Sequence, residues 1–233
     1  MDPDRKTALA VGILFLATFV TSIPAVFLYH PLLDDPSYLL NGGSDTGVTV
    51  GAVLELLLIV ANIGTAVVLY PVLKRQSASG ALGYVTARIM ECAFIAVGIL
   101  ALLAAVTLSE DSTASPATLG AISEALVAVH DWTFRLGPGF VVGLGNGILL
   151  GYLMYRSGLV PPRMAILGLV GGPLIVLTGV AVVLGIIDEE SAPKAIATAP
   201  EFAWELSLGV YLTVKGFRRA PSLLGGGPES AVV

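Results

Sequence analysis

Charged residues are scarce in this chain of 233 residues. Only 12% of the residues are Asp, Glu, Lys or Arg, whereas 55% are apolar, and the mean hydropathy is +0.88. A soluble domain of this composition would lack the polar surface that it needs to face water. The composition therefore excludes an ordinary soluble protein and predicts a protein of the lipid bilayer.

Residues that form disulfides or bind metals are also rare. The single cysteine, Cys92, offers no intramolecular disulfide and no thiolate metal cluster. The two histidines, His30 and His130, lack a metal-binding spacing such as HxxxH, although each lies at an outer helix end where it could ligate a haem or a metal. We expect no cofactor and no metal, with these two histidines as the alternative.

Long apolar runs are what the chain has in abundance. Each run is close to the roughly 20 residues that cross a bilayer as a helix, and none shows the period-two alternation of a membrane β-barrel. We predict an all-α fold, a six-transmembrane-helix bundle in one domain, residues 1–220, followed by a flexible cytoplasmic tail, residues 221–233. The predicted crossings are 8–29, 50–72, 82–108, 138–155, 164–187 and 201–217.

Basic residues indicate the orientation of this bundle. They flank the runs on one side of the membrane, whereas the loops of the other side hold only Lys194 and are rich in acidic residues. Because Lys and Arg accumulate on the cytoplasmic side, both termini are predicted to be cytoplasmic. No pattern supports nucleic-acid binding. The predicted cytoplasmic set is Arg5, Lys6, Lys74, Arg75, Arg156, Arg163, Lys215, Arg218 and Arg219.

The segment between the third and fourth runs has a different pattern. After Pro116, the apolar Leu119, Ile122 and Leu126 recur at helical spacing. This spacing predicts a short external amphipathic helix on the bundle or at the membrane surface. The Gly-Pro-Gly triplet at 137–139 is expected to break or kink that helix before the fourth crossing.

Glycines recur every fourth residue in the fourth run. Such a strip lets a neighbouring helix approach closely, because no side chain stands between the two backbones. The fifth run repeats the spacing with Gly168 and Gly172, so we predict that these two helices pack on each other. The strip consists of Gly139, Gly143, Gly147 and Gly151.

Several ionisable side chains fall inside the predicted helices. Each costs a few kcal/mol in lipid, so such residues usually face the interior of a bundle. Arg88 and Glu91, three residues apart, predict a structural ion pair. Other polar residues gather in the outer half of the bundle, and we predict that they line an outward-facing pocket. The alternative is that the arginines only tie helices together. The predicted pocket residues are Glu55, His130, Asp131, Arg135 and Glu205.

Four segments resemble the DUF4386 family of bacterial integral membrane proteins. The segments are RIMECA from Arg88, HDWTFRLGPGF from His130, GYLMYRSGLVPPRMAILG from Gly151 and PEFAWELSLGVYLTVKGF from Pro200. The resemblance covers most of the chain and implies a six-helix protein of the bacterial cytoplasmic (inner) membrane. The family's function is unknown, so the resemblance implies no activity. The family's recurring residues fall on Arg88, Glu91, His130, Asp131, Trp132, Glu201, Glu205 and Lys215, and the chain departs from the pattern with Pro161 and Pro162, where one proline is usual.

These residues leave three roles open. The outward-facing pocket could bind or pass a small cationic or zwitterionic solute, or protons. The chain could instead be a non-catalytic subunit or sensor that forms a homo-oligomer or hetero-oligomer through its glycine strip. An intramembrane enzyme would use His130 and Asp131, but no nucleophile elbow, HExxH motif or phosphate-binding glycine loop is present. The sequence therefore favours the bilayer and a small-molecule ligand as partners, and disfavours catalysis.

Overall fold

The computed structural model describes residues 2–111 and 113–218, and within these residues the chain forms helices and no strand. The predicted all-α fold is confirmed. The predicted flexible tail, residues 221–233, lies outside the described residues. The elements are α1 (Pro3–Asp34), α2 (Thr46–Leu73), α3 (Ala78–Asp111), α4 (Pro116–Leu136), η1 (Gly137–Val141), η2 (Gly143–Leu150), α5 (Gly151–Ser157), α6 (Pro162–Val183) and α7 (Ala192–Val214).

Five helical segments of the described chain are long and apolar enough to cross a membrane, which confirms a multi-pass membrane protein. The sixth predicted crossing lies in α7, which is not among the five; Glu201 and Glu205 lower the hydropathy of this helix. That crossing, the side of the membrane on which the termini lie, and the bacterial inner membrane stay predictions. The five segments are Pro3–Asp34, Thr46–Leu73, Ala78–Glu110, Pro116–Ser157 and Pro162–Val183.

Local sequence signals explain several helix ends. The Oγ of Ser115 accepts a hydrogen bond from the backbone N–H of Thr118 at 3.2 Å, which caps the start of α4. The chain leaves α5 at Gly158, whose φ of +66° is a left-handed conformation that glycine adopts without strain. Pro162 then occupies the first turn of α6, where its missing N–H costs nothing.

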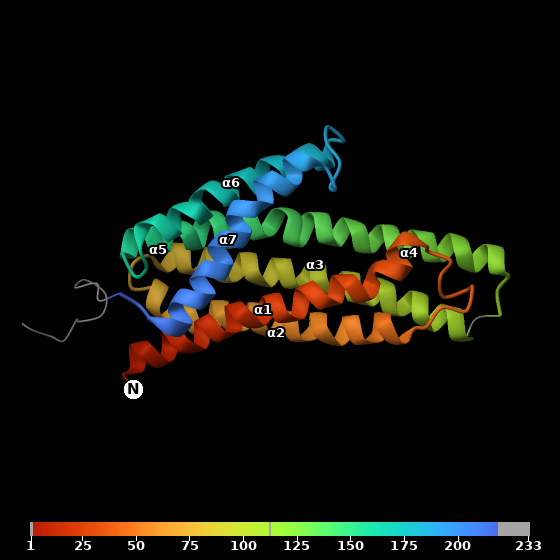
Figure 1. Cartoon of the computed structure of the whole chain (residues 1–233), viewed down its shortest axis with the longest axis horizontal. Coiled ribbons are helices and arrows are strands. Elements are labelled where there is room, and N and C mark those ends of the chain that lie inside the picture. Colours follow the sequence, from red (N-terminus) through yellow and green to blue (C-terminus); the bar gives the residue numbers. More distant parts are fainter. Residues whose placement is uncertain (1, 112, 219–233) are drawn as a thin grey trace, which may run out of the picture.

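The predicted break between an external helix and the fourth crossing is wrong. Residues Pro116–Ser157 form one uninterrupted helical segment, which runs along the bundle in green in Figure 1. The Gly-Pro-Gly triplet begins a stretch of π-helix, η1 and η2, instead of a break. Pro138 has no N–H to donate, and the wider π-helical turns accommodate this loss without ending the helix. The predicted external helix is therefore the first part of a longer helical segment, and its position outside the membrane stays a prediction.

The long helices pack around three apolar clusters. The first includes Phe15 and Tyr84, the second includes Tyr29 and Leu102, and a smaller third, between α2 and α3, includes Leu58. Part of the third cluster lines a space at the middle of the bundle. Figure 1 shows α7 crossing α1 obliquely, whereas α1, α2 and α3 lie roughly along the long axis. The first two clusters thus pack the helices on either side of this space, and the third packs α2 against α3 beside it.

Part of the glycine strip lies against α6 of the same chain. A Cβ atom at Gly143 would lie 2.7 Å from the carbonyl oxygen of Gly172, and one at Gly147 would collide with the Cα atom of Gly172. At Gly151 the nearest atom would be the backbone nitrogen of Leu169, at 3.2 Å. These three glycines therefore allow η2, α5 and α6 to approach at backbone distance.

Candidate functional site

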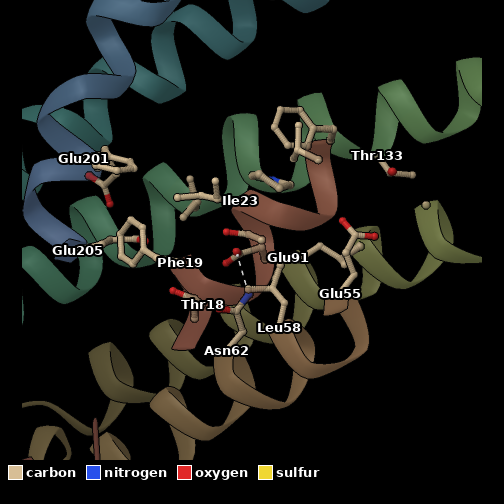
Figure 2. A pocket seen from close by; sticks show the side chains of 18 of the residues that line it. Thr18, Phe19, Ile23, Glu55, Leu58, Asn62, Glu91, Thr133, Glu201 and Glu205 are labelled. Atoms are coloured by element: carbon tan, nitrogen blue, oxygen red, sulfur yellow. Dashed lines mark hydrogen bonds between the residues drawn. The ribbon is translucent and has the colours of Figure 1, made fainter. Parts of the chain in front are cut away.

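The space at the middle of the bundle is a cavity of about 300 Å³ that is partly open to its surroundings. Helices α1, α2, α3, α4 and α7 contribute most of its lining. Figure 2 shows Glu201 and Glu205 of α7 at one side of the cavity and Glu55 of α2 at the other. Four glutamates, one arginine and one histidine are among the lining residues, so the cavity carries an excess of acidic groups. These six are Glu55, Arg88, Glu91, His130, Glu201 and Glu205.

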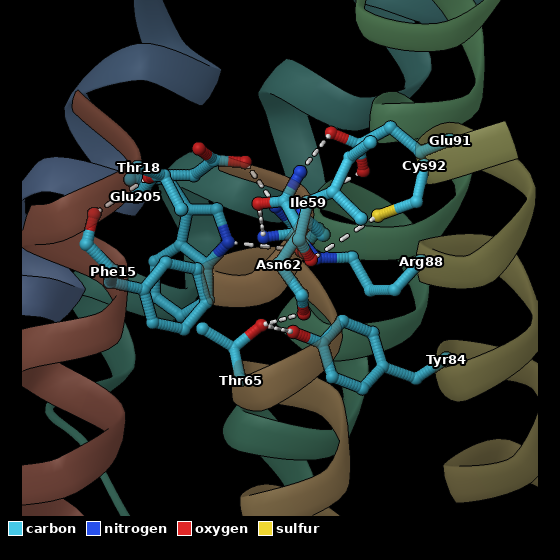
Figure 3. Close-up of polar contacts among 12 residues, drawn as sticks. Phe15, Thr18, Ile59, Asn62, Thr65, Tyr84, Arg88, Glu91, Cys92 and Glu205 are labelled. Atoms are coloured by element: carbon cyan, nitrogen blue, oxygen red, sulfur yellow. Dashed lines mark hydrogen bonds and ion pairs between the residues drawn. The ribbon is translucent and has the colours of Figure 1, made fainter. Parts of the chain in front are cut away.

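Arg88 lies at the centre of a closed polar network at the floor of the cavity. Its Nη1 donates to Glu91 Oε2 at 2.8 Å, and its Nη2 donates to Asn62 Oδ1 at 2.9 Å. Asn62 Nδ2 in turn donates to Glu91 Oε1 at 3.2 Å (Figure 3). The Phe15 ring lies 5.8 Å from the guanidinium carbon. Both carboxylate oxygens of Glu91 thus have donors, and the predicted ion pair is part of a triad of two helices.

Glu205 is held by a second amide. The Nδ2 of Asn146 donates to Glu205 Oε1, and the indole Nε1 of Trp204 donates to the backbone oxygen of Asn146 at 3.0 Å. In a π-helix the backbone bonds run to the fifth residue along, so the regular ladder is disturbed and carbonyl groups can accept from side chains. The π-helical stretch η2 therefore places Asn146 between α7 and the cavity floor.

Glu201 differs from the other three glutamates. Its side chain is buried, with a residue exposure of 2%, and neither Oε1 nor Oε2 has a hydrogen-bond partner in the described chain. Cβ atoms at Gly147 and Gly171 would lie 2.7 Å and 2.9 Å from Glu201 Oε2. The missing side chains at these two glycines make the room that this carboxylate occupies. Glycine at 147 therefore serves both helix packing and the site.

The other side of the cavity holds Glu55 and His130. The Tyr29 hydroxyl donates to Glu55 Oε2 at 3.0 Å, and the Tyr29 and His130 rings make an edge-to-face contact with centroids 5.5 Å apart. His130 Nδ1 lies 3.8 Å from Asp131 Oδ1 and has no hydrogen-bond partner among the described residues. This group of aromatic and acidic side chains extends the polar lining away from Arg88.

Three of the five predicted pocket residues line the cavity, namely Glu55, His130 and Glu205. Asp131 and Arg135 do not line it. Asp131 follows His130 by about 100° around the helix, so it points elsewhere. The Arg135 guanidinium lies over the Trp132 ring, 5.1 Å from its centroid, on the outer surface of α4.

The site contains residues that were absent from the predicted pocket. Glu201 is one, although its spacing of four residues from Glu205 places both on one face of α7. Asn62 is another, and its spacing of seven residues from Glu55 is the corresponding signal on α2. Thr18 and Thr133 also line the cavity, but threonine is common in membrane helices and its presence alone carries no signal.

A separate ion pair, between a buried lysine and a half-buried glutamate, lies at the start of α7. Lys194 Nζ donates to the carbonyl oxygen of Gly139 in η1 at 2.7 Å and forms an ion pair with Glu189 Oε2 at 3.8 Å. Burial lowers the pKa of Lys194, and the charge of Glu189 opposes this. Burial also raises the pKa of Glu189, opposed by the charges of Lys194 and Arg135. The backbone of Gly139 in η1 thus supplies a hydrogen-bond acceptor to the first turn of α7.

No group of three metal-binding side chains occurs within residues 2–111 and 113–218. His30 lies on the surface, where its Nδ1 is 2.7 Å from Asp34 Oδ2, far along α1 from the cavity floor. The residues that surround the cavity combine carboxyl groups, an amide and hydroxyls with a larger number of apolar side chains. The arrangement can hold positive charge and surround an apolar group.

Comparison with known proteins places the chain in a family. No match to it was found among curated proteins or among solved structures. A family model described as a domain of unknown function, DUF4386, matches residues 10–216. This range includes the cavity residues and six of the seven helices in full or nearly so. The chain belongs to the DUF4386 family.

Proposed function

We propose that the central cavity binds a small organic cation within the membrane. The observation that carries the proposal is the state of Glu201, a buried carboxylate with two oxygens that no group of the described chain contacts by a hydrogen bond. A buried charge without a partner is costly, because it has lost its hydration and gained nothing in return. An ammonium group on the ligand would supply the missing partner.

The remaining charges of the cavity support a cation over an anion. The Arg88 guanidinium is the one permanent positive charge among the lining residues, and Glu91 and Asn62 already accept hydrogen bonds from both of its terminal nitrogens. Glu55 and Glu205 each accept one hydrogen bond and add further negative charge. An anionic ligand would therefore meet repulsion from three carboxylates and find no free guanidinium.

The apolar part of the lining supports an organic ligand. Phe19, Leu58 and Ile175 lie among the lining residues, together with the exposed ring of Phe202. Such surfaces take up the carbon skeleton of a ligand, while a few polar groups fix its orientation. Aromatic faces additionally attract cations. A hydrated inorganic ion would use neither property, so an amine with an apolar body fits the cavity better.

Transport and proton binding are finer versions of the same proposal. A proton and an ammonium group would compete for the Glu201 carboxylate, so a pH gradient could drive exchange of one for the other. The subunit hypothesis has less support, because Gly143 and Gly147 are occupied by α6 of the same chain and offer no free strip to another protein. We retain binding of a small organic cation as the conclusion.

The proposal is tested with benzylammonium as the probe. The full chain in phosphatidylcholine nanodiscs should bind benzylammonium saturably, and the neutral benzyl alcohol should not compete. Glu201→Gln should weaken binding at least tenfold, because an amide has no charge for the ammonium group. The matched control is Glu124→Gln on the exposed surface of α4, which should bind like the parent. Equal binding by the parent and Glu201→Gln would overturn the proposal.

A further inference from the structure

The polar and apolar residues that line the cavity occupy different depths. Among the lining residues, those that are exposed are all apolar, with exposed fractions of 41–47%. The charged residues Arg88, Glu91 and Glu201 and the amide of Asn62 are buried. The cavity therefore has a polar floor and an apolar mouth. The residues of the mouth are Ile23 and Val26 of α1, Phe134 of α4 and Phe202 of α7.

The mouth lies where α1 and α7 separate. At one end, the Arg5 guanidinium donates to the carbonyl oxygens of Leu212 and Thr213. The last ring contact between the two helices is the edge-to-face pair of Phe19 and Phe202, with centroids 5.1 Å apart. Further along α1, Ile23 faces the cavity instead of a neighbouring helix. Figure 1 shows α7 departing from α1 in this direction, alongside α6.

The position of this mouth determines what surrounds it. Ile23 and Val26 lie within Pro3–Asp34, a segment apolar enough to cross the membrane. Exposed isoleucine, valine and phenylalanine side chains at this level of a membrane protein contact acyl chains, because water at this depth would not solvate them. A mouth that opened to water would instead carry polar side chains at its rim.

We propose that the cavity opens sideways to the bilayer between α1 and α7, and that its ligand is an amphipathic amine whose alkyl tail stays in lipid. This inference rests on the proposed function and names its ligand class. The ammonium head reaches Glu201, while the tail passes Phe202 and Ile23. A volume of about 300 Å³ is at the lower end for ligand pockets, so it holds a head group and leaves a long tail outside.

A series of alkylammonium ions tests the length dependence. Butyl-, hexyl-, octyl- and decylammonium are used to displace radiolabelled benzylammonium from the full chain in phosphatidylcholine nanodiscs. The affinity, expressed against the ligand concentration in water, should improve about fourfold for each added methylene through to decylammonium. Each methylene moves from water into lipid, and the tail stays in lipid when the head group binds. Decanol, which has the tail and no charge, should not displace the probe.

The outcomes separate the two proposals. If benzylammonium binds and needs Glu201, but the affinity falls once the chain exceeds the cavity, the site exists and is closed to lipid. That result overturns the sideways opening alone. If benzylammonium does not bind to the parent chain, the proposed function itself is overturned. A continuous rise through decylammonium, with no displacement by decanol, supports both.

A substitution at the mouth tests the route directly. Ile23→Trp should fill the opening and reduce the decylammonium affinity at least tenfold. Val20→Trp is the matched control, because Val20 is also on the surface of α1 and does not line the cavity. Val26→Trp provides a second blocking variant if Ile23→Trp does not fold. Unchanged decylammonium affinity in a folded blocking variant would overturn the lateral route.

Discussion

Arg88 and Glu201 line the same cavity and are equally buried, but only Arg88 has hydrogen-bond partners for its terminal atoms among the described residues. Glu91 and Asn62 close a network around the Arg88 guanidinium, whereas the Glu201 carboxylate has no hydrogen-bond partner in the described chain. A satisfied buried charge fixes the arrangement of the helices that carry it. A buried group without a hydrogen-bond partner is instead available to bind a complementary group of a ligand. The difference separates a structural group from a ligand-binding group within one site.

The largest effect is expected when the satisfied group is broken. Arg88→Met should reduce the free energy of unfolding by about 3–5 kcal/mol, because it leaves the Glu91 carboxylate buried without its donor. Unfolding in detergent, followed by circular dichroism, measures the change. The double variant Arg88→Met with Glu91→Leu should recover part of the loss. If the double variant is less stable than Arg88→Met alone, the ion pair is not what holds these helices.

A second large effect concerns the close approach of η2 and α6. Gly147→Leu should destabilise the protein by more than about 2 kcal/mol, because its side chain would collide with Gly172 and with the Glu201 carboxylate. Gly120→Ala in α4 is the control, since a Cβ atom there has no neighbour within 4 Å. This control should be neutral or slightly stabilising. A Gly147→Leu protein that unfolds like the parent would show that the strip is not tightly packed.

The unsatisfied group should behave in the opposite way to Arg88. Glu201→Gln replaces a buried carboxyl group that has no partner with a neutral amide, so the free energy of unfolding should stay equal or rise by about 1 kcal/mol. Benzylammonium binding should be lost in the same variant. Glu201→Gln therefore should lower the binding affinity without lowering the stability, whereas Arg88→Met should lower the stability. Loss of stability in Glu201→Gln comparable to that in Arg88→Met would erase the distinction between the two groups.

The smallest expected effect lies outside the cavity. Because burial raises the pKa of Glu189, the folded protein binds more protons than the unfolded chain as the pH rises above about 4.5. The free energy of unfolding should therefore fall as the pH rises through that window. Glu189→Gln should flatten this pH dependence of the free energy of unfolding by less than about 1 kcal/mol. The control is Glu190→Gln at the exposed neighbouring position, which should leave the pH dependence unchanged. An unchanged pH profile in Glu189→Gln would remove this interpretation.

Much of the fold follows from the sequence because the bilayer imposes it. A predominantly apolar run of about 20 residues has few alternatives to a membrane helix, so the apolar runs predicted α1, α2, α3 and α6. The helices extend beyond these runs, because a helix continues into water until a cap or a proline ends it; α1 begins at Pro3 rather than at residue 8. The π-helical stretch η2 could not be predicted, since it depends on tertiary packing against α6.

The candidate site was predictable in its chemistry and less so in its membership. Ionisable residues inside apolar runs pointed to the cavity, and Glu55, His130 and Glu205 line it. Asp131 was assigned from its depth in the outer half of the bundle, although its side chain and that of His130 face different directions around the helix. Depth along each helix was not a guide to proximity, because α7 crosses the bundle obliquely and brings Glu205 into one cavity with Arg88.

A structure with a heavy-atom ligand tests the central claim most directly. The full chain is crystallised with 4-bromobenzylammonium, and the anomalous signal locates the bromine. We predict that the ammonium nitrogen lies about 3 Å from the Glu201 carboxylate, with the brominated ring directed past Phe202 toward the opening between α1 and α7. Bromine located outside the cavity, or a Glu201 carboxylate that is paired with Arg88 while the ligand binds elsewhere, would contradict the account.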